Sequence, residues 1–121
     1  MADTVLVVED DTVTQSLMTE VLSVHGFEAV ISRNGLDAID LARAHNPRVI
    51  LMDIRLPDVP GTEIASRLKA TPDVAHISII AVTTHVMKGE EELIRSSGCD
   101  AYVSKPIDVV KLIEIIRRLM D

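Results

Sequence analysis

The chain has 121 residues, a formal net charge of −7 and a single cysteine, Cys99. This length is enough for one domain with a substantial hydrophobic core. Because a nucleic-acid backbone is bound by clustered Lys and Arg, the acidic balance argues against that function. The N-terminus has no basic region followed by a long apolar stretch, so neither export nor membrane insertion is expected. A lone cysteine excludes an internal disulfide, which favours a reducing cytoplasm.

Short apolar runs alternate with segments of helical period along the whole chain. This alternation is typical of an α/β protein whose parallel sheet is covered by helices on both faces. Within it, Thr12 and Gln15 have the spacing of a capping box, which predicts how the first helix begins. In chain order, we expect a strand near residues 4–9, a helix near 12–25, a strand near 27–32, a helix near 35–45, a strand near 48–53, a helix near 61–69, a strand near 78–83, a helix near 87–97, a strand near 100–104 and a helix near 108–120.

Four of the apolar runs end on side chains that phosphoryl chemistry uses. The first run leads into Glu9 and Asp10, and later runs lead into Asp53, Thr83 and Lys105. Ligand sites of open parallel sheets lie beyond the carboxyl ends of the strands, so these side chains are expected in one crevice. Clustered carboxylates suit Mg²⁺, and a carboxylate can take a phosphoryl group covalently. A cation and a hydroxyl can then bind the phosphoryl oxygens.

Most of these residues also have an ordinary structural interpretation. Asp11, next to the acidic pair, can simply cap the first helix. Thr83 can also cap a helix, and Lys105 with Pro106 can form a turn that contains a cis peptide bond. Asp53 is different, because an acidic residue directly after a buried run gains nothing structurally. It is the combination of these residues at strand ends that indicates a site.

Two predicted helices have a wider apolar stripe than packing on one sheet requires, which is about 100°. The stripe covers roughly 180° of the first helix and about 160° of the last. A deeply buried helix and an exposed edge that docks a partner both explain such a stripe. The residues are Val13, Leu17, Met18, Val21, Leu22 and Val24 in the first helix, and Val109, Leu112, Ile113, Ile115, Ile116, Leu119 and Met120 in the last.

The motifs at the strand ends resemble the receiver domain of bacterial two-component response regulators. The resemblance rests on Val7–Asp11, Leu51–Gly61, Val82–Thr83 and Tyr102–Pro106, and it covers the whole chain. It implies one receiver domain over residues 1–121, with no output domain after it. The implied fold is a doubly wound, flavodoxin-like five-stranded parallel sheet with strand order 2-1-3-4-5 and five helices. Further segments, Val86–Glu91 and Gly98–Tyr102, look most like single-domain regulators of the cell cycle and receivers of hybrid sensor kinases.

The resemblance also implies which residues form the metal site. Asp53 is expected to be the phosphoacceptor, and Glu9 and Asp10 the acidic pair. Asp10 and Asp53 are expected to contact Mg²⁺ directly, and Arg55 to give the ion its backbone carbonyl.

Phosphoryl binding and switching are assigned by the same resemblance. Thr83 and Lys105 are expected to bind the phosphoryl oxygens, and Tyr102 to be the aromatic residue that turns inward when Thr83 moves. Arg55 and His85 stand two positions after the acceptor and the threonine. Their bulk could shield the phosphoryl group from water or could point into solvent, which leaves its lifetime open.

A receiver of this kind is not an enzyme, apart from catalysing its own phosphorylation and dephosphorylation. The resemblance implies a phosphohistidine donor on a histidine kinase or phosphotransfer protein, and a downstream target protein in the cytoplasm. The kinase is expected to dock on the first helix and beside Lys105, at Asp11, Thr14, Leu17 and Ile107. The downstream protein is expected to bind the fourth helix, fifth strand and fifth helix, with Leu112, Ile115 and Leu119 as the docking area.

The residues allow three other interpretations, two of which the sequence disfavours. The chain could be a receiver excised from a larger hybrid kinase. A Mg²⁺-dependent phosphatase with an aspartyl nucleophile needs a second Asp two residues later, where this chain has Arg55. A flavin mononucleotide carrier needs a phosphate loop rich in glycine and hydroxyls, where the Glu9–Asp11 run would repel the phosphate.

Overall fold

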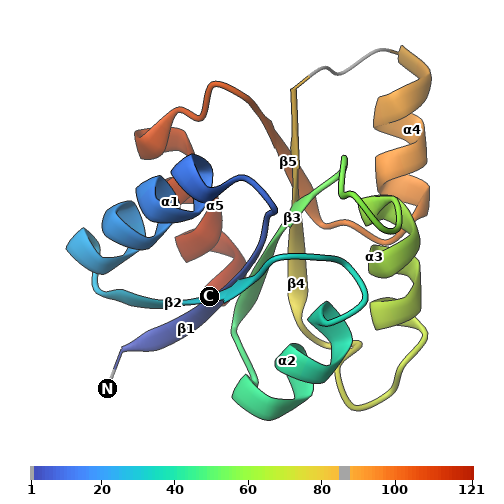
Figure 1. The fold of residues 1–121 in the computed structure, drawn as a ribbon, viewed down its shortest axis with the longest axis horizontal. Helices are drawn as coiled ribbons and strands as arrows, with labels where there is room; N and C mark the ends of the chain where they lie inside the picture. Colours follow the sequence, from blue (N-terminus) through green and yellow to red (C-terminus); the bar gives the residue numbers. More distant parts are fainter. Residues whose placement is uncertain (1, 85–87) are drawn as a thin grey trace.

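A computed structural model describes residues 2–84 and 88–121, which form a parallel sheet with helices on both faces (Figure 1). The strand order is β2-β1-β3-β4-β5, and all four pairings are parallel. The fold and strand order implied by the resemblance are therefore confirmed. The strands are β1 (Asp3–Val8), β2 (Phe27–Ser32), β3 (Val49–Asp53), β4 (Ser78–Thr83) and β5 (Ala101–Ser104), and the helices are α1 (Thr12–Val24), α2 (Ala38–His45), α3 (Gly61–Lys69), α4 (Lys88–Ser96) and α5 (Val109–Met120).

The sheet separates two aliphatic cores. Figure 1 shows α1 and α5 together on one side and α2, α3 and α4 on the other. Because side chains alternate along a strand, Leu6 and Val8 pack in the core with α2, α3 and α4, and Val5 and Val7 pack in the core with α1 and α5. All five residues of the central strand β3 are buried, so it ends at Asp53 inside the molecule.

Helix α1 begins with a different cap from the one predicted. The Asp11 side chain accepts the backbone N–H of Thr14 at 2.9 Å, so Asp11 is the N-cap. The prediction of a capping box formed by Thr12 and Gln15 is wrong, because the Gln15 side-chain amide instead donates to the Glu9 carbonyl at 2.7 Å. Gln15 therefore ties the start of α1 to the end of β1.

Helix α2 begins three residues later than predicted. The N–H of Asp37 donates to the side-chain carbonyl of Asn34 at 2.9 Å, and the N–H of Ala38 donates to the Gly35 carbonyl at 3.1 Å. Residues 34–37 consequently form a turn that precedes the helix. This turn leaves the N–H groups of Gly35 and Leu36 available to another part of the chain.

Further expectations concern the segments that follow β4 and β5. The Lys105–Pro106 peptide bond is cis, as suspected from the sequence. The predicted start of the fourth helix at residue 87 and the side chain of His85 lie outside the described residues. Among the helices described, none is long and apolar enough to cross a membrane.

Candidate functional site

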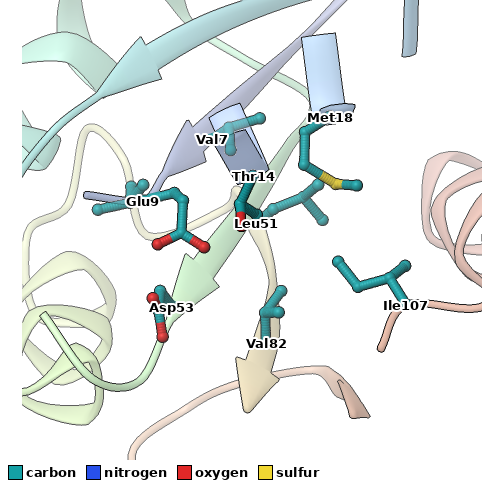
Figure 2. A pocket seen from close by; sticks show the side chains of 9 residues that line it. Val7, Glu9, Thr14, Met18, Leu51, Asp53, Val82 and Ile107 are labelled. Carbon is teal, nitrogen blue, oxygen red and sulfur yellow. The ribbon is translucent and has the colours of Figure 1, made fainter. Parts of the chain in front are cut away.

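Three carboxylates meet at the carboxyl ends of β1 and β3. Each of Glu9, Asp10 and Asp53 offers an oxygen within 4.8 Å of the others, although they come from opposite ends of the first half of the chain. Glu9 is 3% exposed and Asp53 is 7% exposed, and Asp10 faces solvent. Figure 2 shows the carboxylates of Glu9 and Asp53 facing each other in one pocket. The predicted convergence of these residues is confirmed.

Backbone groups hold the two buried carboxylates in place. The N–H of Arg55 donates to Asp53 Oδ1 at 3.0 Å, and the N–H of Asp10 donates to Glu9 Oε2 at 3.0 Å. The Arg55 residue is exposed, so its side chain lies at the surface while its backbone adjoins the acceptor. Both carboxylates are therefore oriented by main-chain groups that a side-chain substitution leaves intact.

Lys105 brings a cation to this cluster from the far end of the chain. Its ammonium lies 2.8 Å from Glu9 Oε1 and 3.6 Å from Asp53 Oδ2. Burial raises the pKa of Glu9 above its ordinary value, Asp53 adds to the rise, and the Lys105 ammonium opposes it. Burial disfavours the Lys105 ammonium, but the hydrogen bond to Glu9 and the charge of Asp53 outweigh that effect and raise its pKa. Lys105 is therefore charged at neutral pH.

Thr83 lies at the end of β4 and is 1% exposed. Its hydroxyl donates to Glu90 Oε1 on α4 at 3.3 Å, and its carbonyl accepts the N–H of Lys105 at 2.8 Å. Tyr102, on the neighbouring strand β5, is half-buried and packs against the core on the α4 side. The backbone bond between Thr83 and Lys105 places the predicted hydroxyl and ammonium on adjacent strands at the same edge.

The backbone behind Asp53 is packed too tightly for a side chain at Gly61. The N–H of Gly61 donates to the Ile54 carbonyl at 2.9 Å, which closes the β3–α3 loop (residues 54–60) onto the end of β3. A Cβ at Gly61 would stand 2.2 Å from the Asp53 carbonyl oxygen and 2.9 Å from Ile54 Cα. Glycine is therefore required here for space, so that the loop can return directly behind the acceptor.

The residues predicted to receive a kinase lie on the α1 side of the pocket. Leu17 is 50% exposed, and Thr14 and Ile107 are half-buried and line the pocket with Glu9 and Asp53 (Figure 2). Asp11 is exposed and caps α1, so its structural interpretation is confirmed. On α1 the wide apolar stripe splits, because Met18 and Leu22 are buried and others stay exposed, with Val13 at 75% and Val24 at 75%.

The residues predicted to form the downstream docking area are mostly unable to do so in this conformation. Leu112 is fully buried and Ile115 is only 7% exposed, since both belong to the core between α5 and the sheet. That part of the prediction is wrong, because the stripe on α5 packs inward across most of its width. Leu119 is half-buried at the end of the helix.

The sequence analysis gave no role to Glu90 or Asp58, which stand there only within longer motifs. Glu90 contacts the hydroxyl of Thr83, and Asp58 accepts backbone N–H groups from a loop more than twenty residues away. No local sequence pattern predicts either contact. The Glu90 contact depends on how α4 meets β4, and the Asp58 contact depends on how two loops meet.

This combination of fold and site matches a known family. Residues 5–117 match the model of the response regulator receiver domain. The chain therefore belongs to the response regulator receiver domain family, and it is a signalling protein of two-component systems rather than a catalytic enzyme.

Two kinds of relatives make the similarity more specific. The polar-differentiation response regulator DivK of Brucella anthropi is 48% identical over 117 residues, which cover 97% of this chain and 95% of that protein. DivK of Brucella melitensis is 47% identical over the same share. Among solved structures, the receiver domain of a sensor histidine kinase from Pseudomonas aeruginosa has a TM-score of 0.91 at 28% identity, covers 99% of this chain and 98% of that one, and carries a magnesium ion in its active-site cleft.

Proposed function

We propose that this chain is the phosphoacceptor of a two-component phosphorelay, in which Asp53 receives a phosphoryl group from a phosphohistidine. The donor would be a histidine kinase or a histidine phosphotransfer protein. The observation that carries the proposal is the position of Asp53, a buried carboxylate 3.6 Å from the Lys105 ammonium and beside two further carboxylates. The similarity to DivK, itself a response regulator, supports the same role.

The set of candidate ligands fits Mg²⁺. Glu9, Asp10 and Asp53 offer only carboxylate oxygens, and Mg²⁺ takes one or two such ligands together with water and phosphoryl oxygens. We assign Asp10 and Asp53 as direct ligands, Arg55 as a ligand through its backbone carbonyl, and Glu9 as their acidic neighbour. The related receiver from Pseudomonas aeruginosa, with magnesium in its cleft, supports Mg²⁺ as the ion. Bound Mg²⁺ would neutralise charge on the phosphoryl oxygens.

The transfer itself asks little of the protein beyond positioning. A carboxylate oxygen of Asp53 attacks phosphorus, a P–O bond forms, and the P–N bond to the donor imidazole breaks with its electrons leaving on the nitrogen. Lys105 already lies within reach of Asp53, so its ammonium can bind a phosphoryl oxygen without a large movement. Its contact with Glu9 would keep the ammonium at the site in the unphosphorylated state.

The switch follows from the single proton of the Thr83 hydroxyl. A hydroxyl donates one hydrogen bond at a time, and here it donates to Glu90. Donation to a phosphoryl oxygen on Asp53 would replace that bond and draw Thr83 toward the site. Tyr102, half-buried on the next strand, would then fill the space that Thr83 leaves. A change of this size can bias a distant face by a few kcal/mol at most.

We assign the two partners to different faces. The kinase or phosphotransfer protein would dock on α1 around Asp11, Thr14 and Leu17, with Ile107. Thr14 and Ile107 line the Asp53 pocket, and Leu17 is an exposed apolar side chain on the same helix as Thr14. The downstream protein would bind the exposed parts of α4, β5 and α5, next to Tyr102 and the half-buried Leu119. We propose that both partners meet this chain in the cytoplasm, in line with the free thiol of Cys99.

Phosphorylation by acetyl phosphate tests the chemistry directly. With Mg²⁺, the wild type should gain one acid-labile phosphoryl group, measured by intact mass, and EDTA should prevent the gain. Asp53→Asn keeps the shape of the acceptor but removes the nucleophile, so it should gain none. Asp40→Asn, which removes one exposed carboxylate from α2, is the matched control and should behave as the wild type. A phosphoryl group that survives Asp53→Asn would contradict the proposal.

Partner identity can be approached with the same pair of proteins. Phosphorylated wild type and Asp53→Asn would be used as bait, and proteins bound only to the wild type would be identified. Those proteins are candidates for the downstream target, and a bound histidine kinase should be recovered with both baits. If phosphorylation changed no interaction, the signalling part of the proposal would be wrong.

A further inference from the structure

Asp58 joins two loops that are distant in the sequence. The N–H of Gly35 donates to Asp58 Oδ1 at 3.0 Å, and the N–H of Leu36 donates to Asp58 Oδ2 at 2.9 Å. Both oxygens of one carboxylate are thus used to hold the β2–α2 loop (residues 33–37). The hydrogen bond from Gly35 is the main reason that the pKa of Asp58 lies below its ordinary value, with burial opposing it and Leu36 adding to it.

The β3–α3 loop that carries Asp58 begins and ends at the acceptor. Its base is closed by the hydrogen bond from the Gly61 N–H to the Ile54 carbonyl, and Gly61 lies so near the Asp53 carbonyl that a Cβ there would clash with it. Arg55, whose N–H binds Asp53, lies within it. The two hydrogen bonds to Asp58 hold the far side of this loop, so the loop is held both at its base and at its far side.

The β2–α2 loop is itself tied to the other half of the acidic cluster. The N–H of Glu9 donates to the Ser32 carbonyl at 2.9 Å, and the Ser32 hydroxyl donates to the Asn34 carbonyl at 2.7 Å. The loop is also packed closely, since a Cβ at Gly35 would stand 2.8 Å from Ile64 Cγ1. One loop therefore links the residues around Glu9 to those around Arg55.

We propose that Asp58 is a positioning residue for the metal site, because it holds the loop that presents the Arg55 carbonyl in register with Glu9 and Asp10. This inference rests on the proposed function, in which that carbonyl binds Mg²⁺. Asp58 is exposed, and its carboxylate binds Gly35 and Leu36 rather than the acidic cluster, so it would act through the β3–α3 loop. Loss of a group that hydrogen-bonds directly to a metal ligand weakens metal affinity by about 10- to 100-fold, so a group that acts through a loop should not exceed the lower end of that range.

The test compares Mg²⁺ affinity with stability in three variants. Asp58→Ala removes both acceptors, Asp58→Asn keeps one oxygen but loses the charge, and Asp40→Asn removes one exposed charge elsewhere. We expect the Mg²⁺ dissociation constant, measured by calorimetric titration at 25 °C, to rise about tenfold in Asp58→Ala and by less in Asp58→Asn. Asp40→Asn should leave it unchanged. Excess Mg²⁺ should restore the rate of phosphorylation by acetyl phosphate in both Asp58 variants.

The outcomes separate this inference from the proposed function. If both Asp58 variants bound Mg²⁺ like the wild type and differed only in melting temperature, Asp58 would be merely structural and the inference would be overturned. A slow phosphorylation that excess Mg²⁺ failed to restore would overturn it as well. A wild type with no affinity for Mg²⁺ would overturn the proposed function itself.

Discussion

The two sides of the site are built in different ways. Around Asp53, the carboxylates are oriented by backbone N–H groups, and Gly61 leaves no space between the returning loop and the strand end. Around Thr83, a hydroxyl bonds to a flexible side chain, Glu90, on a helix, and the nearby aromatic residue Tyr102 is only half-buried. On the first side the carboxylates are oriented by main-chain groups and paired with Lys105, and on the second side the contact joins two side chains.

This difference matches what each side has to do. Phosphoryl transfer gains from charges and ligands that are already in place before the reaction begins. Signalling instead needs an element with two arrangements of similar free energy, so that one new group can shift the balance. A rigid acceptor beside an exchangeable hydroxyl allows both within one small domain.

The packing around Asp53 can be disrupted by adding one methyl group at Gly61. Gly61→Ala would push Cβ into the backbone of Asp53, so we expect a loss of about 3 kcal/mol in the free energy of unfolding, at the upper end for overpacking. Gly89→Ala is the matched control, since a Cβ there meets nothing within 4 Å and lies in α4. It should gain about 0.5 kcal/mol. Urea unfolding measures both, and equal effects would show that the acceptor backbone is not tightly packed.

The side around Asp53 should be stabilised by bound Mg²⁺. Clustered carboxylates disfavour each other's charged forms, and a cation that binds only the folded state stabilises it. At ten times the dissociation constant, Mg²⁺ should add roughly 1.4 kcal/mol to the free energy of unfolding. Thermal melts with Mg²⁺ and with EDTA, at matched ionic strength, test this. Identical melting temperatures would remove Mg²⁺ from the proposed function.

The side around Thr83 can be tested by substituting Glu90. If its carboxylate competes with the phosphoryl group for the Thr83 hydroxyl, Glu90→Ala should speed phosphorylation by acetyl phosphate about two- to fivefold, the worth of one ordinary hydrogen bond. Glu90→Gln keeps an oxygen acceptor and should lie closer to the wild type. Glu92→Ala removes an exposed charge from the same helix and serves as control. Equal rates for the two alanine variants would mean that Glu90 does not hold Thr83 back.

The smallest effect on phosphorylation is expected at Tyr102. Tyr102→Ala leaves every group around Asp53 in place, so its phosphorylation by acetyl phosphate should match the wild type. Binding of the downstream protein should nevertheless weaken, because the switch residue is missing. Both are measurable on one preparation, by mass and by pull-down. If phosphorylation and binding fell together, the separation between the two sides would be wrong.

The site was predictable from sequence because of how parallel sheets are built. Glu9, Asp53, Thr83 and Lys105 each follow an apolar run, and strand ends of one direction meet at one edge, so their convergence needed no knowledge of strand order. The order itself came only from the family resemblance. Local pattern also set the helices to within a few residues, apart from the turn before α2.

The errors came from contacts that local pattern does not encode. A helical stripe gives the width of the apolar surface but not how much of it the neighbouring elements cover, so Leu112 and Ile115 were placed outside although α5 buries both. Asp58 contacts a residue on another loop and Glu90 contacts a residue on a strand, and the spacing of these residues in the sequence does not predict either contact. Gln15 fits a capping box by spacing, yet the end of β1 is a better partner for its amide.

The aliphatic composition of both cores has a practical consequence for spectroscopy. The chain contains no tryptophan and one tyrosine, and that tyrosine is Tyr102. Tyrosine emission from the intact protein therefore arises at the very residue that is proposed to move, without a label or an engineered probe. A stopped-flow trace of this emission after phosphorylation would report the motion of one side chain in the native molecule.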